Sequence, residues 1–139
     1  MLDKDRILTK VDELDAYLNE LKQIAPPRYG EYQQIEKKRS CERLLQLCIE
    51  CVIDVCKLLV AQLRLGLPSE ENDLFTKLEN KGLLSHQVAE VVRQMRGSRN
   101  ILIHEYAAVD DELIYTYVST RLGDFEGFEK EILTFLKAC

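Results

Sequence analysis

Eight consecutive residues, from Arg99 to Tyr106, bring together several side chains that can do chemistry. They read Arg-Asn-Ile-Leu-Ile-His-Glu-Tyr, late in a segment whose apolar spacing predicts a helix. The imidazole of His104 can donate or accept a proton near neutral pH. Arg99 carries a permanent charge on a planar fork that suits phosphate oxygens. The set indicates phosphodiester cleavage without a metal, in which His104 moves protons and Arg99 neutralises charge at phosphorus. In RNA, the neighbouring 2′-hydroxyl can serve as the nucleophile.

Helix geometry limits how these side chains can meet. A helix turns by about 100° per residue, so Arg96, Asn100 and His104 share one stripe. Arg99 precedes His104 by five positions and is therefore roughly 140° away around the same helix. Either the helix is distorted near His104, or a symmetric dimer completes the site. Arg99 also lies close to the apolar stripe of its own helix, so its charge needs a partner, a ligand or a subunit boundary.

Simpler interpretations of the same residues remain open. A histidine near a helix end often caps the helix or lies on the surface. Arg93, Arg96 and Arg99 form a basic cluster at three-residue spacing. Such a cluster suits nucleic acid, but it is also typical of a solvated helix edge.

Two further groups of residues resemble known kinds of site. Glu50 and Asp54 stand four apart on a long apolar helix, where paired carboxylates can act as acid and base or hold a metal. We favour a structural role, in which they form salt bridges to the arginine-rich helix and orient Arg99 or His104. Cys48-x2-Cys51 is half of a zinc motif, but no second pair completes it. We therefore expect buried thiols and no metal or other cofactor.

Composition excludes several classes of protein. The net charge of −5 means that any nucleic-acid site must be local. No apolar run approaches the roughly 20 residues of a membrane span, and the N-terminus lacks a signal-peptide pattern. We expect a cytoplasmic protein with no membrane contact. The 139 residues suit one domain over 1–139, and the few glycines and prolines favour a helical bundle.

The periodic segments predict an all-α, antiparallel bundle of four to five helices with one long helix. Apolar residues recur at spacings of three and four in each segment. Ser69 is the predicted cap of the third helix, and Gly66-Leu67-Pro68 the predicted stop of the second. The expected helices are 3–24, 31–65, 70–80, 84–104 and 111–137, the last weakened by two glycines in its middle.

Two stretches resemble one known family. Residues 99–110 carry Arg-Asn-x3-His-Glu-Tyr-x3-Asp, which resembles the R-x4-H-x-Y signature of the HepT-type HEPN toxins. Residues 43–54, Arg-Leu-Leu-Gln-Leu-Cys-Ile-Glu-x3-Asp, are similar to the second helix of that family. The resemblance extends over nearly the whole chain in length and helix order.

The resemblance implies a HEPN-like helical homodimer whose two motifs meet in a cleft at the interface. It implies a metal-independent endoribonuclease in which Arg99 binds the phosphate and His104 is the general acid and base. Asn100 would help to shape the cleft, with Arg96, Glu50 and Asp54 in support.

The resemblance also implies a partner and a modification. HepT-type toxins pair with an MNT-type minimal nucleotidyltransferase antitoxin in a type VII-like toxin–antitoxin system. This antitoxin transfers AMP to the tyrosine of the motif, here Tyr106. A bulky anionic group beside His104 would block the cleft and repel RNA. Tyr106 could otherwise simply pack the helix end.

Two other functions compete with the toxin interpretation. The chain could be a HEPN protein that binds a minimal nucleotidyltransferase or a nucleotide and cleaves nothing. It could also be a purely structural bundle, although Arg99 beside the core would then be an avoidable cost.

Overall fold

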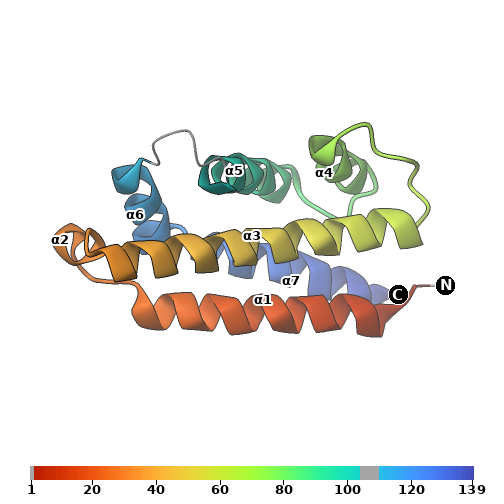
Figure 1. Ribbon diagram of the computed structural model, residues 1–139. Coiled ribbons are helices and arrows are strands. Elements are labelled where there is room, and N and C mark those ends of the chain that lie inside the picture. The colour runs from red at the N-terminus through yellow and green to blue at the C-terminus, as the bar shows by residue number, and fades with distance from the viewer. Residues whose placement is uncertain (1, 104–109) are drawn as a thin grey trace.

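The computed structural model describes residues 2–103 and 110–139, and these residues are helical apart from short turns. Figure 1 shows their arrangement. The helices are α1 (Lys4–Ile24), α2 (Tyr29–Tyr32), α3 (Ile35–Gln62), α4 (Glu71–Asn80), α5 (His86–Ile103), α6 (Asp111–Thr120) and α7 (Gly123–Ala138). The predicted all-helical bundle built around one long helix is confirmed. His104 and Tyr106 lie outside the described residues.

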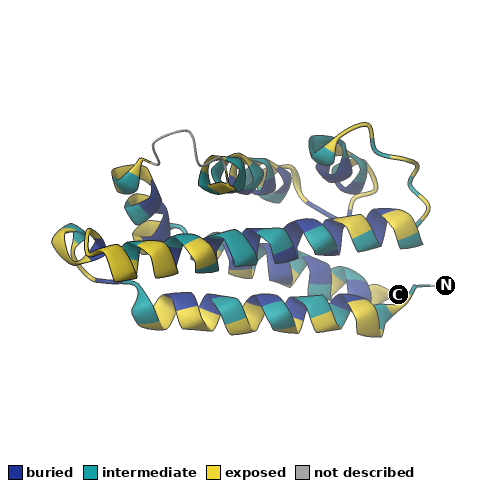
Figure 2. Ribbon diagram, viewed as in Figure 1, coloured by how far each residue is buried: buried dark blue, intermediate teal, exposed yellow. Residues whose placement is uncertain are grey.

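The long helix α3 is the centre of the bundle. It runs antiparallel to α1, while α4 and α5 lie on its other side and α7 passes behind it (Figure 1). It packs against each of the other six helices of the described chain. Burial explains this position, because buried residues recur throughout the middle of α3 (Figure 2). Its buried residues are Cys41, Leu45, Cys48, Ile49, Cys51, Val52, Ile53, Val55, Cys56, Leu59 and Val60.

The ends of α3 differ from the prediction. The helix begins at Ile35, after the separate single turn α2, and it ends at Gln62. Arg64 terminates it in the left-handed conformation, with φ of 54°, and the Leu65 amide donates to the Val60 carbonyl at 3.1 Å. This is the usual hydrogen bond of a helix C-terminus closed by a left-handed residue. The predicted stop at Gly66 therefore comes two residues late.

The predicted last helix is interrupted, which corrects the expected 111–137. Helix α6 ends at Thr120 and α7 starts at Gly123, because Arg121 leaves the helical conformation with φ of −119° and ψ of 10°. The Arg121 side chain holds this corner: its Nε donates to Asp124 Oδ2 at 3.0 Å and its Nη2 to Gln94 Oε1 at 2.6 Å.

The start of α4 also departs from the prediction. Ser69 does not cap the helix; Glu70 occupies that position without a side-chain hydrogen bond. The Ser69 amide instead donates to Asp73 Oδ2 at 3.1 Å. As a result, Glu71 becomes the first residue of α4, on the side of the bundle where α5 lies.

No helix among residues 2–103 and 110–139 has the length and apolar character that a membrane crossing needs.

One acidic side chain is buried between α1 and α7. Glu129 is 7% exposed, and its Oε1 has no hydrogen-bond partner in the described part of the chain. Burial, together with a hydrogen bond to the side chain of Asp15, raises the pKa of Glu129 from its usual value near 4.5 to about 8. Glu126 adds to this rise, while Lys22 opposes it. Protonated Glu129 is therefore the form that the fold accommodates.

A raised pKa in the folded state gives the stability a defined pH dependence. Between about pH 4.5 and pH 8 the unfolded chain ionises Glu129 while the folded chain keeps it protonated, so the free energy of unfolding should fall as pH rises. Glu129→Gln should remove this slope and be more stable than wild type at pH 8, by on the order of a few kcal/mol. Urea unfolding at several pH values measures both effects. Glu112→Gln is the matched control, since Glu112 is exposed on α6 and does not contribute to the pKa of Glu129. An equal slope in wild type and Glu129→Gln would contradict this assignment.

Candidate active site

The described part of the candidate motif lies in the last turns of α5. Arg96, Arg99 and Asn100 are all half-buried, and α5 is α-helical through Ile103. A distortion that brings Arg99 and His104 onto one face therefore cannot lie between Arg99 and Ile103. His104 and Tyr106 remain predictions, because they fall outside the described residues.

The guanidinium group of Arg99 has two hydrogen-bond partners, of which one, Glu71, is charged. Its side chain is 14% exposed, its Nη2 donates to the carboxylate of Glu71, and its Nε donates to Asn100 Oδ1 at 3.1 Å. Hydrogen bonds to a carboxylate are the strong kind, because both groups are charged. The charge of Arg99, which lies beside the apolar stripe of α5, therefore has its partner, Glu71, in the same chain.

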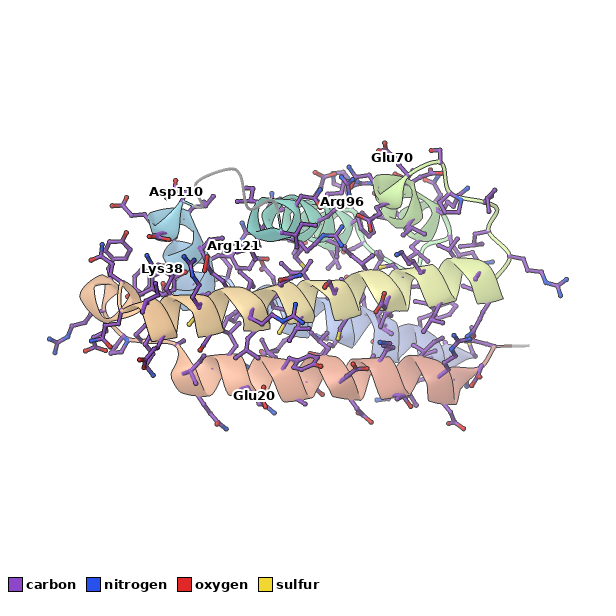
Figure 3. All side chains as sticks on the ribbon, in the orientation of Figure 1. Glu20, Lys38, Glu70, Arg96, Asp110 and Arg121 are labelled. Atoms are coloured by element: carbon purple, nitrogen blue, oxygen red, sulfur yellow. The ribbon has the colours of Figure 1, made fainter. Side chains whose placement is uncertain are left out.

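Glu71 is the residue that sequence analysis missed. Its Oε1 accepts hydrogen bonds from Arg99 and also from Arg96, whose Nε lies 2.9 Å away. Lys57 Nζ lies 4.0 Å from its other oxygen. Burial favours a higher pKa for Glu71, but the two arginines outweigh burial and lower it. Glu71 is therefore an ionised acceptor shared by two cations. Figure 3 shows the region, with Arg96 between α5 and α4 and Glu70 at the start of α4.

The rest of the basic cluster also faces α4. Arg93 Nη2 donates to Thr76 Oγ1 at 3.0 Å and lies 3.5 Å from Glu79 Oε1, while its Nη1 donates to Glu90. The three arginines at three-residue spacing are thus neutralised in part by carboxylates of α4 and α5. They therefore form neither a broad basic surface for nucleic acid nor a fully solvated helix edge, the two interpretations that the sequence left open.

The expected partners of Glu50 and Asp54 were wrong. Asp54 Oδ2 lies 3.4 Å from Lys10 Nζ on α1, and Glu50 Oε1 accepts from Gln46 Nε2 at 3.3 Å within α3. Neither carboxylate forms an ion pair with the arginine-rich helix in the described residues. The physical reason is that carboxylates compete for the Arg99 guanidinium, and Glu71 is the one that binds it.

A shared cavity nevertheless brings Arg99 close to these carboxylates. A cavity of about 360 Å³ opens between α1 and α3, with Arg99 on its wall. Its charged lining consists of Lys10, Lys57 and Arg99 facing Glu13, Glu50 and Asp54. Of the predicted site residues, Glu50 and Asp54 line this cavity together with Arg99. Arg96 and Asn100 do not line it.

The cysteines behave as small apolar side chains. Cys48 and Cys51 are buried, and burial raises the pKa of Cys48 to about 12 and of Cys51 to about 11. Thiols with such pKa values are poor metal ligands, because the thiolate is the binding form. No group of three or more potential metal ligands occurs among the residues that the structure describes.

Comparison with known families identifies the chain. The family model described as Ribonuclease HepT-like matches residues 14–132. The chain belongs to the HepT-like ribonuclease family. The match covers the helices that carry Arg99, Glu71, Glu50 and Asp54, and it confirms the resemblance inferred from the motif.

Characterised relatives of this HepT-like chain include two nucleases. It is 27% identical over 128 residues to the mRNA nuclease HepT of Shewanella oneidensis, covering 89% of this chain and 93% of that protein. It is 26% identical over 131 residues to the tRNA nuclease HepT of Aphanizomenon flos-aquae, covering 94% of this chain and 89% of that protein. The two relatives are named for different RNAs, so similarity to them does not select a substrate.

A solved structure gives the same fold. The tri-AMPylated Shewanella oneidensis HEPN toxin, in complex with its MNT antitoxin, superimposes with a TM-score of 0.87 at 27% identity. The match covers 96% of this chain and 99% of that one. The described helices therefore have the HEPN arrangement.

Proposed function

We propose that this protein is the toxin of a type VII-like toxin–antitoxin pair and cleaves RNA without a metal. Arg99 and His104 are its catalytic residues, and two copies of the chain form the site. The observation that carries the proposal is the state of Arg99: a motif arginine whose guanidinium is fixed by Glu71 and Asn100 on the wall of a cavity. Family membership and the two nuclease relatives support the same conclusion.

The reaction can be written with the chain's own residues. The 2′-hydroxyl of the substrate attacks the adjacent phosphorus while an imidazole accepts its proton. A bond forms between the 2′-oxygen and phosphorus, and the bond to the 5′-oxygen breaks as that oxygen receives a proton. The products are a 2′,3′-cyclic phosphate and a 5′-hydroxyl. Arg99 stabilises the extra negative charge on the phosphoryl oxygens during the transfer.

A homodimer would supply the geometry and both proton-transfer groups. Two motifs facing each other place Arg99 of one copy near His104 of the other, which removes the angular conflict within one helix. Two imidazoles can then serve as base and acid. Apolar side chains exposed beside the motif support a subunit contact there: Ile101 is 38% exposed, Ile103 42% and Leu113 49%.

The second candidate function is a HEPN protein that binds a nucleotidyltransferase without cleaving RNA. Three carboxylates line the cavity, and Glu71 already engages Arg99, so the described site is less cationic than its arginines alone imply. This interpretation shares the partner with the first but assigns no chemistry to Arg99 and His104.

Cleavage in a metal chelator separates the two functions. Wild-type protein with Tyr106 shown by mass spectrometry to be unmodified should cut cellular RNA in EDTA. Arg99→Ala and His104→Ala should each lose about 100-fold or more of the rate, because each removes charge stabilisation or proton transfer in the transition state. Arg93→Ala is the matched control, an arginine of the same helix that is paired with carboxylates and lies outside the motif. Absence of cleavage by the unmodified wild type would leave the binding function in its place.

We propose further that an MNT-type nucleotidyltransferase silences the toxin by transferring AMP to Tyr106. The related Shewanella oneidensis toxin is tri-AMPylated in complex with an MNT antitoxin. The phenol oxygen would attack the α-phosphate of ATP, with pyrophosphate leaving, and the added phosphate would repel RNA.

This modification has its own test. Incubation with ATP and an MNT-type nucleotidyltransferase should add AMP masses to the wild type and to Tyr115→Phe but not to Tyr106→Phe. The modified wild type should lose RNA cleavage. Addition of AMP to Tyr106→Phe, or full activity of the modified protein, would refute Tyr106 as the inhibitory site.

A further inference from the structure

Arg99 has hydrogen-bond donors left over after its contacts with the residues that the structure describes. A guanidinium carries five N–H groups: one on Nε and two on each terminal nitrogen. Asn100 accepts from Nε, and Glu71 accepts from Nη2. These two partners hold two sides of the planar group. Among the contacts of the described residues, three N–H groups are left, two on Nη1 and one on Nη2. One N–H from each of these nitrogens can form a fork suited to two oxygens of a phosphate.

We propose that Glu71 is a positioning residue of the active site, which holds the Arg99 guanidinium in the orientation that stabilises the transferring phosphoryl group. The inference rests on the proposed nuclease function and deepens it. Glu71 itself touches neither RNA nor the reacting atoms. It acts through Arg99, whose long side chain would otherwise sample many rotamers.

The charges around Glu71 suit this role. One carboxylate shared by Arg96 and Arg99 leaves a net charge of about +1 on the three side chains, so the cluster still attracts phosphate. Without Glu71, the two guanidinium groups would repel each other at close range. Its lowered pKa keeps Glu71 ionised throughout the neutral range, so the arrangement does not depend on pH there.

The same two helices contain a contact that serves as a comparison. Glu79 of α4 pairs with Arg93 of α5 at 3.5 Å and also contacts His86 Nδ1 at 2.9 Å. This pair connects α4 to α5 as Glu71 does, but it involves no residue of the motif. If Glu71 merely joined the helices, changing either glutamate would have similar consequences. If Glu71 orients Arg99, only its loss should affect the chemical step.

The experiment compares Glu71→Gln, Glu71→Ala and Glu79→Gln. Each purified protein is assayed for kcat and KM on one RNA substrate in EDTA, and its Tm is measured. We expect kcat to fall about 10-fold in Glu71→Gln, which keeps one acceptor oxygen, and about 100-fold in Glu71→Ala. KM should change by less than about 3-fold, because orientation matters most in the transition state. Glu79→Gln should retain kcat within about 2-fold while its Tm falls as much as that of Glu71→Gln.

Chemical rescue adds a result that a structural role would not produce. Acetate can occupy the space left in Glu71→Ala, since Glu71 is accessible at the surface, with 26% of its side chain exposed. Added acetate should restore part of kcat in Glu71→Ala and leave Glu79→Gln unchanged.

The possible failures are distinguishable. If wild type cuts RNA and Glu71→Gln cuts equally fast or faster, the positioning role is wrong and the nuclease function stands. If Glu71→Gln and Glu79→Gln lose the same fraction of kcat, Glu71 only joins the helices, and the inference is again wrong. If unmodified wild type cuts no RNA, the nuclease function and the inference fall together.

Discussion

A permanent charge beside the core of α5 has to be satisfied, and the contact between Glu71 and Arg99 satisfies it. Arg99 is mostly buried, so leaving its guanidinium without a partner would be costly. The carboxylate comes from the first turn of α4, a ten-residue helix. The apolar side of α4, with Leu74, Phe75 and Leu78, is buried, and the helix packs against both α3 and α5. Its charged side then faces the arginines of α5, so the position of α4 and the state of the candidate catalytic arginine are linked.

The central helix α3 makes that arrangement possible. Because its middle is buried on most sides, it can support α1 on one side and the α4–α5 pair on the other. Glu50 and Asp54 occupy the part of α3 that remains accessible, between Lys10 of α1 and Arg99 of α5. The cavity there is electrically balanced rather than basic. A narrow site that accepts one phosphate fits this balance better than a wide surface for duplex RNA does.

The helix after the motif, α6, is attached to α3 as well. Asp110 caps α6 by accepting from the Leu113 amide at 3.1 Å. Its neighbour Asp111 accepts from Lys38 Nζ of α3 at 2.8 Å. Figure 3 shows Asp110 and Lys38 at this end of the bundle. Both elements that flank His104 and Tyr106 are therefore attached to α3, which gives the candidate site a rigid support.

Periodic patterns in the sequence were enough to predict the existence of the main helices, because the apolar spacing of each follows from the core it covers. Positions that depend on contacts distant in the sequence were not predictable. Arg121 breaks the last helix through hydrogen bonds to partners on α5 and α7. Asp54 forms its ion pair with Lys10 of α1 and not with the arginines of α5. Glu71 stands in an acidic stretch typical of a helix start, and nothing in that stretch distinguishes it from Glu70.

The motif itself was recognisable because it is defined by residue types at fixed spacing along the chain, which can be read without knowledge of the fold. The prediction of buried cysteines was confirmed for Cys48 and Cys51, which are part of the apolar core surface of α3. The roles of His104 and Tyr106, the homodimer and the single domain over 1–139 stay predictions.

The source of the nucleophile is the most direct test of metal-free cleavage by Arg99 and His104. An RNA oligonucleotide that the protein cuts at one bond is resynthesised with a single 2′-deoxyribose on the 5′ side of that bond. If the 2′-hydroxyl attacks, cleavage at that bond in EDTA should disappear while binding is unchanged, and the unmodified RNA should yield a 2′,3′-cyclic phosphate. Cleavage of the substituted bond at the normal rate would show that another nucleophile acts, and would contradict the proposed chemistry.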